Sequence, residues 1–209
     1  MSAQEWATQA ANKILNRCDQ LSKLTSMEGG IERDYLSPQM AKAYELTAGW
    51  LNEVGIATHI DQAGNLVGRL EGKEPGLPAL VLGSHLDSVP DAGKYDGILG
   101  VVTAVSVVEH LAKTGANKKL PFAIEVLGFG DEEGARFGAT LLGSYAFGGG
   151  WRDEWLGLTD RNGVTMRQAF VDFGLDPDEV GQAARKREDY IGYLEFHIEQ
   201  GPILDQRNR

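Results

Sequence analysis

Two short apolar runs, each followed directly by acidic residues or histidine, constrain the fold of this chain most. The first run is Ala79 to Gly83 and leads into Ser-His-Leu-Asp; the second is Phe122 to Phe129 and leads into Gly-Asp-Glu-Glu. A short run without polar alternation is typical of a strand buried on both faces of a sheet. Ligands bind beyond the carboxyl ends of strands in open α/β sheets. The pattern therefore predicts an α/β fold that presents polar groups at the ends of two buried strands.

Helix and hairpin signals separate and flank these strands. The apolar segment from Ile98 to Leu111 is too long for a strand and is closed by Gly115, so it predicts a buried helix. Ser37 and Pro38 form an N-cap and first-turn pair for a helix that stops at Gly55. The other expected elements are a helix over Gln4–Leu24, a hairpin of 56–60 with 66–70, helices over 138–147, 165–173 and 177–187, and a strand over Tyr190–Ile198 that carries His197.

Together these elements predict an α/β domain with a twisted, mainly parallel mixed sheet sandwiched between helices. The chain has 209 residues, which at roughly 100 to 200 residues per domain is one large domain, or a domain plus a fragment, with a sizeable core. Hydrophobic residues make up 42% and charged residues 24%, which excludes a disordered chain.

Composition also limits the partners and the compartment. The formal charge of −10, without any basic cluster, excludes nucleic acid as an expected partner. No apolar run approaches the roughly 18 residues of a membrane span, and the start of the chain has no apolar signal core. The single cysteine, Cys18, cannot form an internal disulfide and is expected to be a small buried side chain. These features predict a cytoplasmic protein that binds neither membrane nor nucleic acid.

Imidazole and carboxylate groups stand at the ends of the strand-like runs. They are His85, Asp96, the adjacent pair Glu132 and Glu133, and His197. This is the ligand set of zinc and other borderline divalent ions, and a chain with one cysteine has no thiolate site. The residues therefore predict a hydrolytic metal centre.

Each of these residues also has a structural interpretation. Asp96 precedes Gly97 and a helix, so its carboxylate could be an N-cap. Either histidine could be a hydrogen-bonded core residue, and the two glutamates could lie in a solvated loop. Their conjunction favours a site, because adjacent carboxylates after a buried strand are otherwise unfavourably placed like charges. His59 and His110 do not lie beside acidic residues or other histidines at a strand end, and they are expected to be structural.

Adjacent glutamates suggest a division of labour. One can bind metal while the other takes a proton from water and later gives it to a leaving nitrogen, provided that its pKa is raised towards neutrality. Asp87, two residues after His85, can accept the free ring N–H of a metal-bound imidazole. A serine nucleophile is less favoured, since no serine lies in a Gly-x-Ser-x-Gly elbow. The pattern predicts amide hydrolysis.

Three ordered motifs add a family resemblance to this interpretation. They are GSHLDSVPDAGKYDGILGV (83–101), GDEEGARFGATLLGS (130–144) and EFHIEQGPIL (195–204). Together they closely resemble the hydantoinase/carbamoylase branch of the dinuclear zinc aminoacylase and carboxypeptidase-type amidohydrolases. That branch includes allantoate amidohydrolase, N-carbamoyl-L-amino-acid hydrolase and β-ureidopropionase. The resemblance implies a metal-dependent enzyme that cleaves the ureido group of a small molecule and releases ammonia and carbon dioxide.

The resemblance also implies a role for each polar residue. His85, Asp96 and His197 would hold one metal ion. Asp96 would bridge to a second ion that is held also by Glu133. Glu132 would be the general base, and Asp87 would orient His85. Zinc, manganese, nickel and cobalt all suit this ligand set.

Two further residues are candidates for the substrate pocket. They are Gln200 and Arg136, although Arg136 could equally be a structural charge at a helix start. The histidine of the third motif, His197, favours ureido substrates over peptides within the resemblance.

Members of the resembled branch are about twice as long as this chain. The resemblance therefore implies that residues 1–209 are the N-terminal part of a catalytic domain, without the lid and dimerisation domain or the last catalytic segment, and that the full-length protein is a homodimer. The chain alone is expected to bind at most one divalent ion tightly. A dipeptidase or aminoacylase of the same superfamily and an inactive metal-binding fragment are the alternatives.

Overall fold

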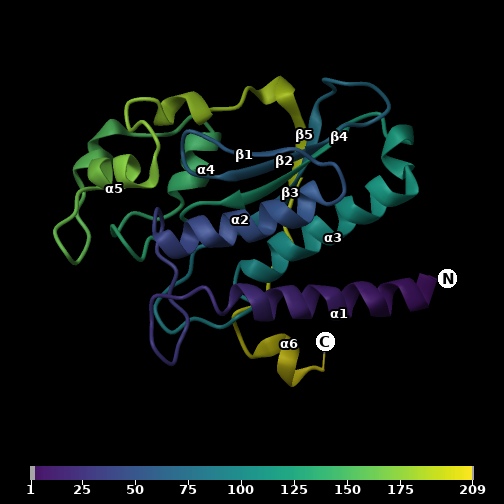
Figure 1. Cartoon of the computed structure of the whole chain (residues 1–209), viewed down its shortest axis with the longest axis horizontal. Helices are drawn as coiled ribbons and strands as arrows, with labels where there is room; N and C mark the ends of the chain where they lie inside the picture. Colours follow the sequence, from purple (N-terminus) through teal and green to yellow (C-terminus); the bar gives the residue numbers. More distant parts are fainter. Residues whose placement is uncertain (1–2, 209) are drawn as a thin grey trace.

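A five-stranded mixed sheet forms the centre of the molecule, and a computed structural model describes it over residues 3–208 (Figure 1). The strands lie in the order β1-β2-β4-β3-β5. Their bounds are Thr58–Ile60 for β1, Leu66–Leu70 for β2, Ala79–His85 for β3, Ala123–Phe129 for β4 and Tyr190–Leu194 for β5.

The sheet is mixed because its first two strands form a hairpin. β1 pairs with β2, and β2 pairs with β4, in antiparallel register. β3 pairs in parallel with β4 on one side and β5 on the other. Four strands therefore run in one direction and β2 alone runs in the other, as the mainly parallel prediction requires. The carboxyl ends of β3, β4 and β5 meet at one edge of the sheet.

Three long helices lie together on one side of the sheet (Figure 1). They are α1 (Ala3–Leu21), α2 (Pro38–Asn52) and α3 (Ile98–Thr114). Helix α3 contacts β3 and β4, α2 contacts β1 and β2, and α1 packs on α3. Helix α3 can lie against the sheet because nine of its residues, valines among them, are buried. The main core fills the space between these helices and the sheet.

The opposite face of the sheet is covered by the segment that follows β4. Phe147, at the end of α4 (Leu142–Phe147), packs against the apolar cluster that contains Val81 and Leu127. A separate apolar cluster joins α4 to α5 (Met166–Phe173) around the buried Phe170. The remaining short elements are η1 (Ala116–Lys119), η2 (Asp153–Gly157), η3 (Val180–Ala183), η4 (Arg187–Asp189) and α6 (Ile203–Gln206).

Most predicted elements are confirmed, and three differ in extent or type. The predicted helix over 177–187 is wrong: only the short turns η3 and η4 form, and Val180 and Ala183 are the buried residues of η3. The helix expected over 138–147 begins only at Leu142, because Gly138 and Leu141 have positive φ angles of 72° and 63°. The strand expected to carry His197 ends at Leu194.

Two expectations about the chain as a whole can be compared with the structure. Cys18 is fully buried, and burial raises the pKa of its thiol to about 11, which fits an inert small side chain. Within residues 3–208, no helix is both long enough and apolar enough to cross a membrane.

Candidate metal centre

His85 is the last residue of β3, and its ring is buried against the start of α3. The side chain is 2% exposed. Gly97 immediately precedes α3 and has a φ angle of +66°, and a Cβ atom at this position would lie under 3.0 Å from the imidazole ring. Glycine is therefore required both by the left-handed backbone and by the close approach of the ring.

Asp96 joins His85 to His197, which lies three residues beyond the end of β5. Its Oδ1 lies 3.2 Å from Nε2 of His197 and 3.9 Å from Nε2 of His85. The two imidazole rings are stacked, with centroids 5.7 Å apart. One ligand atom from each of these three residues lies within 4.8 Å of the others. The structure thus brings together the three residues that the sequence assigned to one ion.

Glu132 and Glu133 form a second group around the same histidine. Oε2 of Glu132 lies 4.0 Å from Nε2 of His85, and ligand atoms of His85 and the two glutamates are all within 4.8 Å of one another. The Glu132 carboxylate is 43% exposed, so it can meet a solute as well as the buried imidazole.

Asp87 contacts residues of both donor groups. Its carboxylate accepts hydrogen bonds from the backbone N–H groups of Glu132 and Glu133, each at 3.1 Å. Its Oδ1 lies 3.3 Å from Nδ1 of His85, and its carbonyl oxygen lies 3.0 Å from the same atom. Asp87 therefore fixes the ring of His85 and the loop that carries both glutamates at the same time.

The electrostatics of the site follow from burial and from these carboxylates. Burial lowers the pKa of His85, but the hydrogen bond and charge of Asp87, with the charge of Glu132, raise it to about 9. Burial is also the main reason that the pKa of Glu133 is raised, although the neighbouring His85 opposes it. The neighbourhood is one that would bind a cation readily, because negative charge is concentrated at its centre.

Asp131 is a buried carboxyl that the sequence interpretation missed. It is 2% exposed, and burial, followed by the charges of Asp87 and Glu132, raises its pKa to about 9. Its position as the first acid after the strand-like run Phe122–Phe129 was the available signal.

The donor set fits a divalent ion. Nε2 of His85 is buried and has no hydrogen-bond partner, which is unusual for a buried polar atom and places a free lone pair or N–H toward Asp96 and Glu132. Imidazole nitrogen and carboxylate oxygen are the donors that zinc and manganese accept in hydrolytic sites.

A cavity of about 620 Å³ opens over these residues. Its wall includes His85, Glu132, His197 and Gln200, together with side chains that the sequence interpretation did not single out for the site: Ser84, Phe129, Leu141, Ser144, Tyr193 and Glu195. Only the fold could identify these, since they come from β3, β4, β5, the start of α4 and the segment after β5.

The two candidate substrate residues have different positions. Gln200 lines the cavity, and its Nε2 donates to both Asp96 oxygens at 2.7 and 2.6 Å. Arg136 does not line this cavity: its guanidinium donates to the carbonyls of Tyr35 and Leu36 and pairs with Asp160 at 3.2 Å. These contacts favour the structural alternative for Arg136, because most of its donors are already used within the fold.

The structural alternative for Asp96 can also be compared with the structure. The N-cap of α3 is Gly97, and no side chain caps this helix. The carboxylate of Asp96 accepts from Gln200 and faces His85 and His197. Asp96 is therefore directed at the site and not at the helix start.

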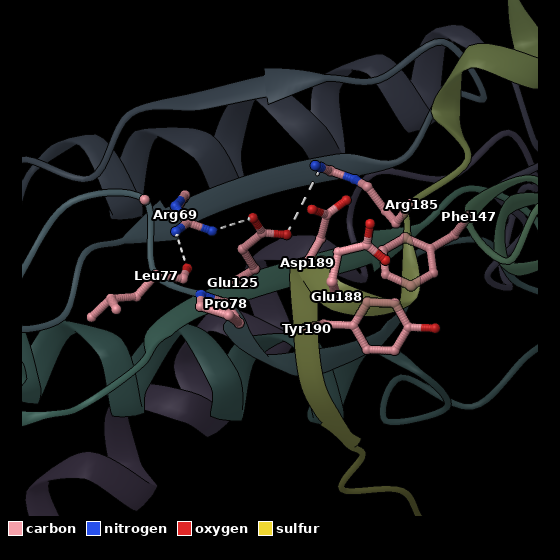
Figure 2. Close-up of a pocket in the computed structure, with 10 residues that line it drawn as sticks. Arg69, Leu77, Pro78, Glu125, Phe147, Arg185, Glu188, Asp189 and Tyr190 are labelled. Carbon is pink, nitrogen blue, oxygen red and sulfur yellow. Dashed lines mark hydrogen bonds and ion pairs between the residues drawn. The ribbon is translucent and has the colours of Figure 1, made fainter.

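A second cavity, of about 310 Å³, lies at the opposite ends of the same strands (Figure 2). Its central group is the buried Glu125 carboxylate, which lies 2.8 Å from Arg69 and 3.8 Å from Arg185. Arg69 also donates to the carbonyl of Leu77 at 2.6 Å. These charges largely satisfy one another, so the cavity is distinct from the donor cluster and shares none of its residues.

An α/β sheet with imidazole and carboxylate donors at its strand ends has the donor chemistry of a divalent-metal site, as metal-dependent hydrolases use. The family model for Peptidase family M28 matches residues 65–182, which is more than half of the chain, and the chain belongs to this family.

Individual relatives give a narrower comparison. The chain is 39% identical over 197 residues to "Allantoate deiminase 1" of Glycine max, covering 93% of this chain and 41% of that protein. It is 42% identical over 178 residues to "N-carbamoyl-L-amino acid amidohydrolase" of Geobacillus stearothermophilus, and the match covers 85% of this chain and 43% of that protein. A crystal structure of a hydantoinase/carbamoylase family amidase from Burkholderia ambifaria superimposes with a TM-score of 0.83 at 28% sequence identity, and the match covers 94% of this chain and 47% of that chain. The chain spans less than half the length of these relatives.

Proposed function

We propose that the protein containing this chain is a metal-dependent amidohydrolase that cleaves the ureido C–N bond of allantoate or of an N-carbamoyl-L-amino acid. Hydrolysis of that bond releases the carbamoyl group as ammonia and carbon dioxide. The observation that carries the proposal is the convergence of His85, Asp96, His197, Glu132 and Glu133 around an unpaired buried imidazole nitrogen. Relatives named for these two substrates support the choice of ureido compounds over peptides.

The metal assignment combines the donor geometry with the family resemblance. His85, Asp96 and His197, which lie together, would hold one ion. Asp96 with Glu133 would contribute to a second ion, as the resemblance implies, and the structure places Glu133 beside His85 and Glu132. Bound divalent ions would polarise the ureido carbonyl and lower the pKa of water, which is chemistry that favours hydrolysis of the ureido group at neutral pH. Zinc or manganese is the proposed metal, and nickel and cobalt suit the same donors.

Glu132 is the proposed general base. Its carboxylate is partly exposed to the cavity and lies beside His85, while its backbone N–H is held by Asp87. In this position it can accept a proton from the attacking water and return it to the departing nitrogen. Asp87 orients His85 through Nδ1, so the opposite nitrogen faces the metal position. Gln200, on the cavity wall, is the proposed substrate contact.

The chain is proposed to be the N-terminal part of the catalytic domain. Coverage of 41% to 47% of the relatives' length supports this placement, and the rest of the substrate pocket would come from the remainder of the protein. We further propose that the full-length protein is a cytoplasmic homodimer. The single buried Cys18 supports a reducing compartment.

The test uses the complete gene product, stripped of metal by a chelator and reloaded with zinc or manganese. Ammonia release is measured with allantoate and with a panel of N-carbamoyl-L-amino acids, beside dipeptides and N-acyl amino acids. Ureido hydrolysis that returns only with metal is the expected result. Metal-dependent cleavage of dipeptides or N-acyl amino acids alone would replace this proposal with the peptidase or aminoacylase alternative.

A further inference from the structure

The two histidines of the site lie beyond the last backbone pairing between their strands. β3 and β5 pair in parallel up to Leu82 and Leu194, and each histidine follows three residues later. Their rings are nevertheless stacked at a centroid distance of 5.7 Å, on either side of Asp96. Another contact must therefore fix the two segments relative to each other.

Glu195 supplies that contact from the β5 side. Its Oε1 accepts a hydrogen bond from the hydroxyl of Ser84 at 2.6 Å, and Ser84 is the residue directly before His85. Its Oε2 accepts from the Tyr193 hydroxyl at 2.8 Å, and the same hydroxyl lies 3.2 Å from the carbonyl of Gly83. Ser84 is 1% exposed, so the donor of this hydrogen bond is buried, whereas Glu195 lies at the surface.

Helix α3 also packs against both of these segments. A Cβ atom at Gly100 would lie under 3.0 Å from the carbonyl of Phe196 and from Cβ of Ser84. The side chain of Ser84 and the carbonyl of Phe196, the residue after Glu195, therefore both lie against the helix where Gly100 has no side chain. Three elements meet here, and the Glu195 carboxylate is the polar group that joins β3 to the segment after β5.

We propose that Glu195 is a positioning residue that sets the spacing of His85 and His197 through its bridge to Ser84 and Tyr193. The inference rests on the proposed metal centre, and it assigns to Glu195 neither a bond to metal nor a proton transfer. Because β3 stays paired with β4 as far as His85, loss of the bridge would free the segment that carries His197 to move relative to His85. Outer contacts of this kind typically change metal affinity about 10- to 100-fold.

The experiment compares four variants of the complete gene product. E195A removes both hydrogen bonds, E195Q keeps an acceptor for Ser84 and a polar partner for Tyr193, and S84A and Y193F each remove one contact. E199A is the matched control, because Glu199 is also two residues from His197 but its carboxylate accepts from the backbone of Leu204 instead. Zinc affinity is measured by titration, the visible absorption of the cobalt-loaded protein reports ligand geometry, and thermal melting of the metal-free protein reports fold stability.

We expect E195A to weaken zinc binding at least 10-fold and to alter the cobalt spectrum, with smaller effects in S84A and Y193F. E195Q and E199A should stay within about threefold of the parent. An E195A protein with parental zinc affinity and cobalt spectrum would overturn the inference, whatever its melting temperature. If E195A does not fold, parental affinity and spectrum in both S84A and Y193F have the same meaning. Failure of the parent itself to bind zinc or cobalt would instead overturn the proposed function.

Discussion

The substitution Gly97→Ala tests the metal centre without changing any polar group. The added Cβ would lie 2.4 Å from Cε1 and Nε2 of His85, and Nε2 is the nitrogen that faces Asp96 and Glu132. Ordinary van der Waals contact begins at 3.4 Å, so the ring must withdraw by about 1 Å. Since the ring is buried and Asp87 holds its other nitrogen, this movement displaces the nitrogen from its donor partners.

The size of the effect can be divided into backbone and site contributions. A non-glycine residue in a sparsely populated backbone region, such as φ +66° and ψ −48° at Gly97, costs about 1–3 kcal/mol, which for a chain of this size lowers the melting temperature by about 2–12 °C. A displacement of about 1 Å at a catalytic group can lower the rate about 100-fold. We therefore expect a large loss of kcat/KM and of zinc affinity with a modest loss of stability.

Gly115→Ala is the matched control for the backbone contribution. Gly115 is at the other end of α3, has a φ angle of +68° compared with +66° for Gly97, and has no atom within 4 Å of an added Cβ. Its ψ angle is 14° compared with −48° for Gly97, so it reports the cost of a positive φ alone. Gly97→Ala should therefore lose more stability than Gly115→Ala in thermal melting, while ammonia release and zinc titration change only in Gly97→Ala. Equal kcat/KM and equal zinc affinity in the two variants would refute the reasoning that Gly97 makes room for a functional imidazole.

Three other outcomes are expected. In the complete protein, Glu132→Gln should retain metal but lose turnover about 100- to 10,000-fold in the ammonia assay, and near-parental turnover would reject Glu132 as the base. Glu109→Ala should lower the free energy of unfolding by about 3–5 kcal/mol in denaturant titrations, because it leaves the Arg17 guanidinium, 2.6 Å away and 3% exposed, without its buried partner; a loss below 1 kcal/mol would contradict this. Burial alone would raise the pKa of Glu109, but hydrogen bonds from Arg17 and Lys13 lower it, so this stabilisation is present above the ordinary value of 4.5 and is lost as the pH falls through the lower folded value. The 209-residue chain by itself should bind at most one zinc ion tightly in isothermal titration and show little ureidohydrolase activity, since Asp96 and Glu133 alone serve the second ion; two tight sites would contradict this.

The sequence was sufficient for elements whose signals are local. The mainly apolar runs predicted as strands became β3 and β4, and every residue of β4 is buried, including Glu125. Helix α2 begins after Ser37, whose side chain accepts from the Met40 backbone as an N-cap. His85 is the last residue of β3, and Asp96 lies just before α3, the next helix along the chain. The order of strand and helix in the fold therefore places both residues at the carboxyl end of the strands.

Features that depend on tertiary partners could not be predicted from sequence. The 177–187 segment contains helix-compatible residues but forms only 3₁₀ turns, in which Val180 and Ala183 pack in the apolar cluster around Phe170. Glu195, directly after the end of β5, accepts a hydrogen bond from Ser84, a residue 111 positions earlier. The contacts of Arg136 depend on carbonyls of the loop before α2. Each of these outcomes is fixed by a residue far away in the chain.

The first turn of α3 connects these observations, because it gives the site its shape without contributing a side chain of its own. Gly97 and Gly100 are three residues apart, so they lie on the same face of the helix start. The first receives the ring of His85 from β3, and the second receives the carbonyl of Phe196 from the segment that leads to His197. Asp96, directly before this turn, is thereby placed between the two histidines. A larger residue at either glycine would separate the strand ends from the helix, so the acid and the two glycines of Asp-Gly-Ile-Leu-Gly act as one structural unit that sets the donor spacing of the metal centre.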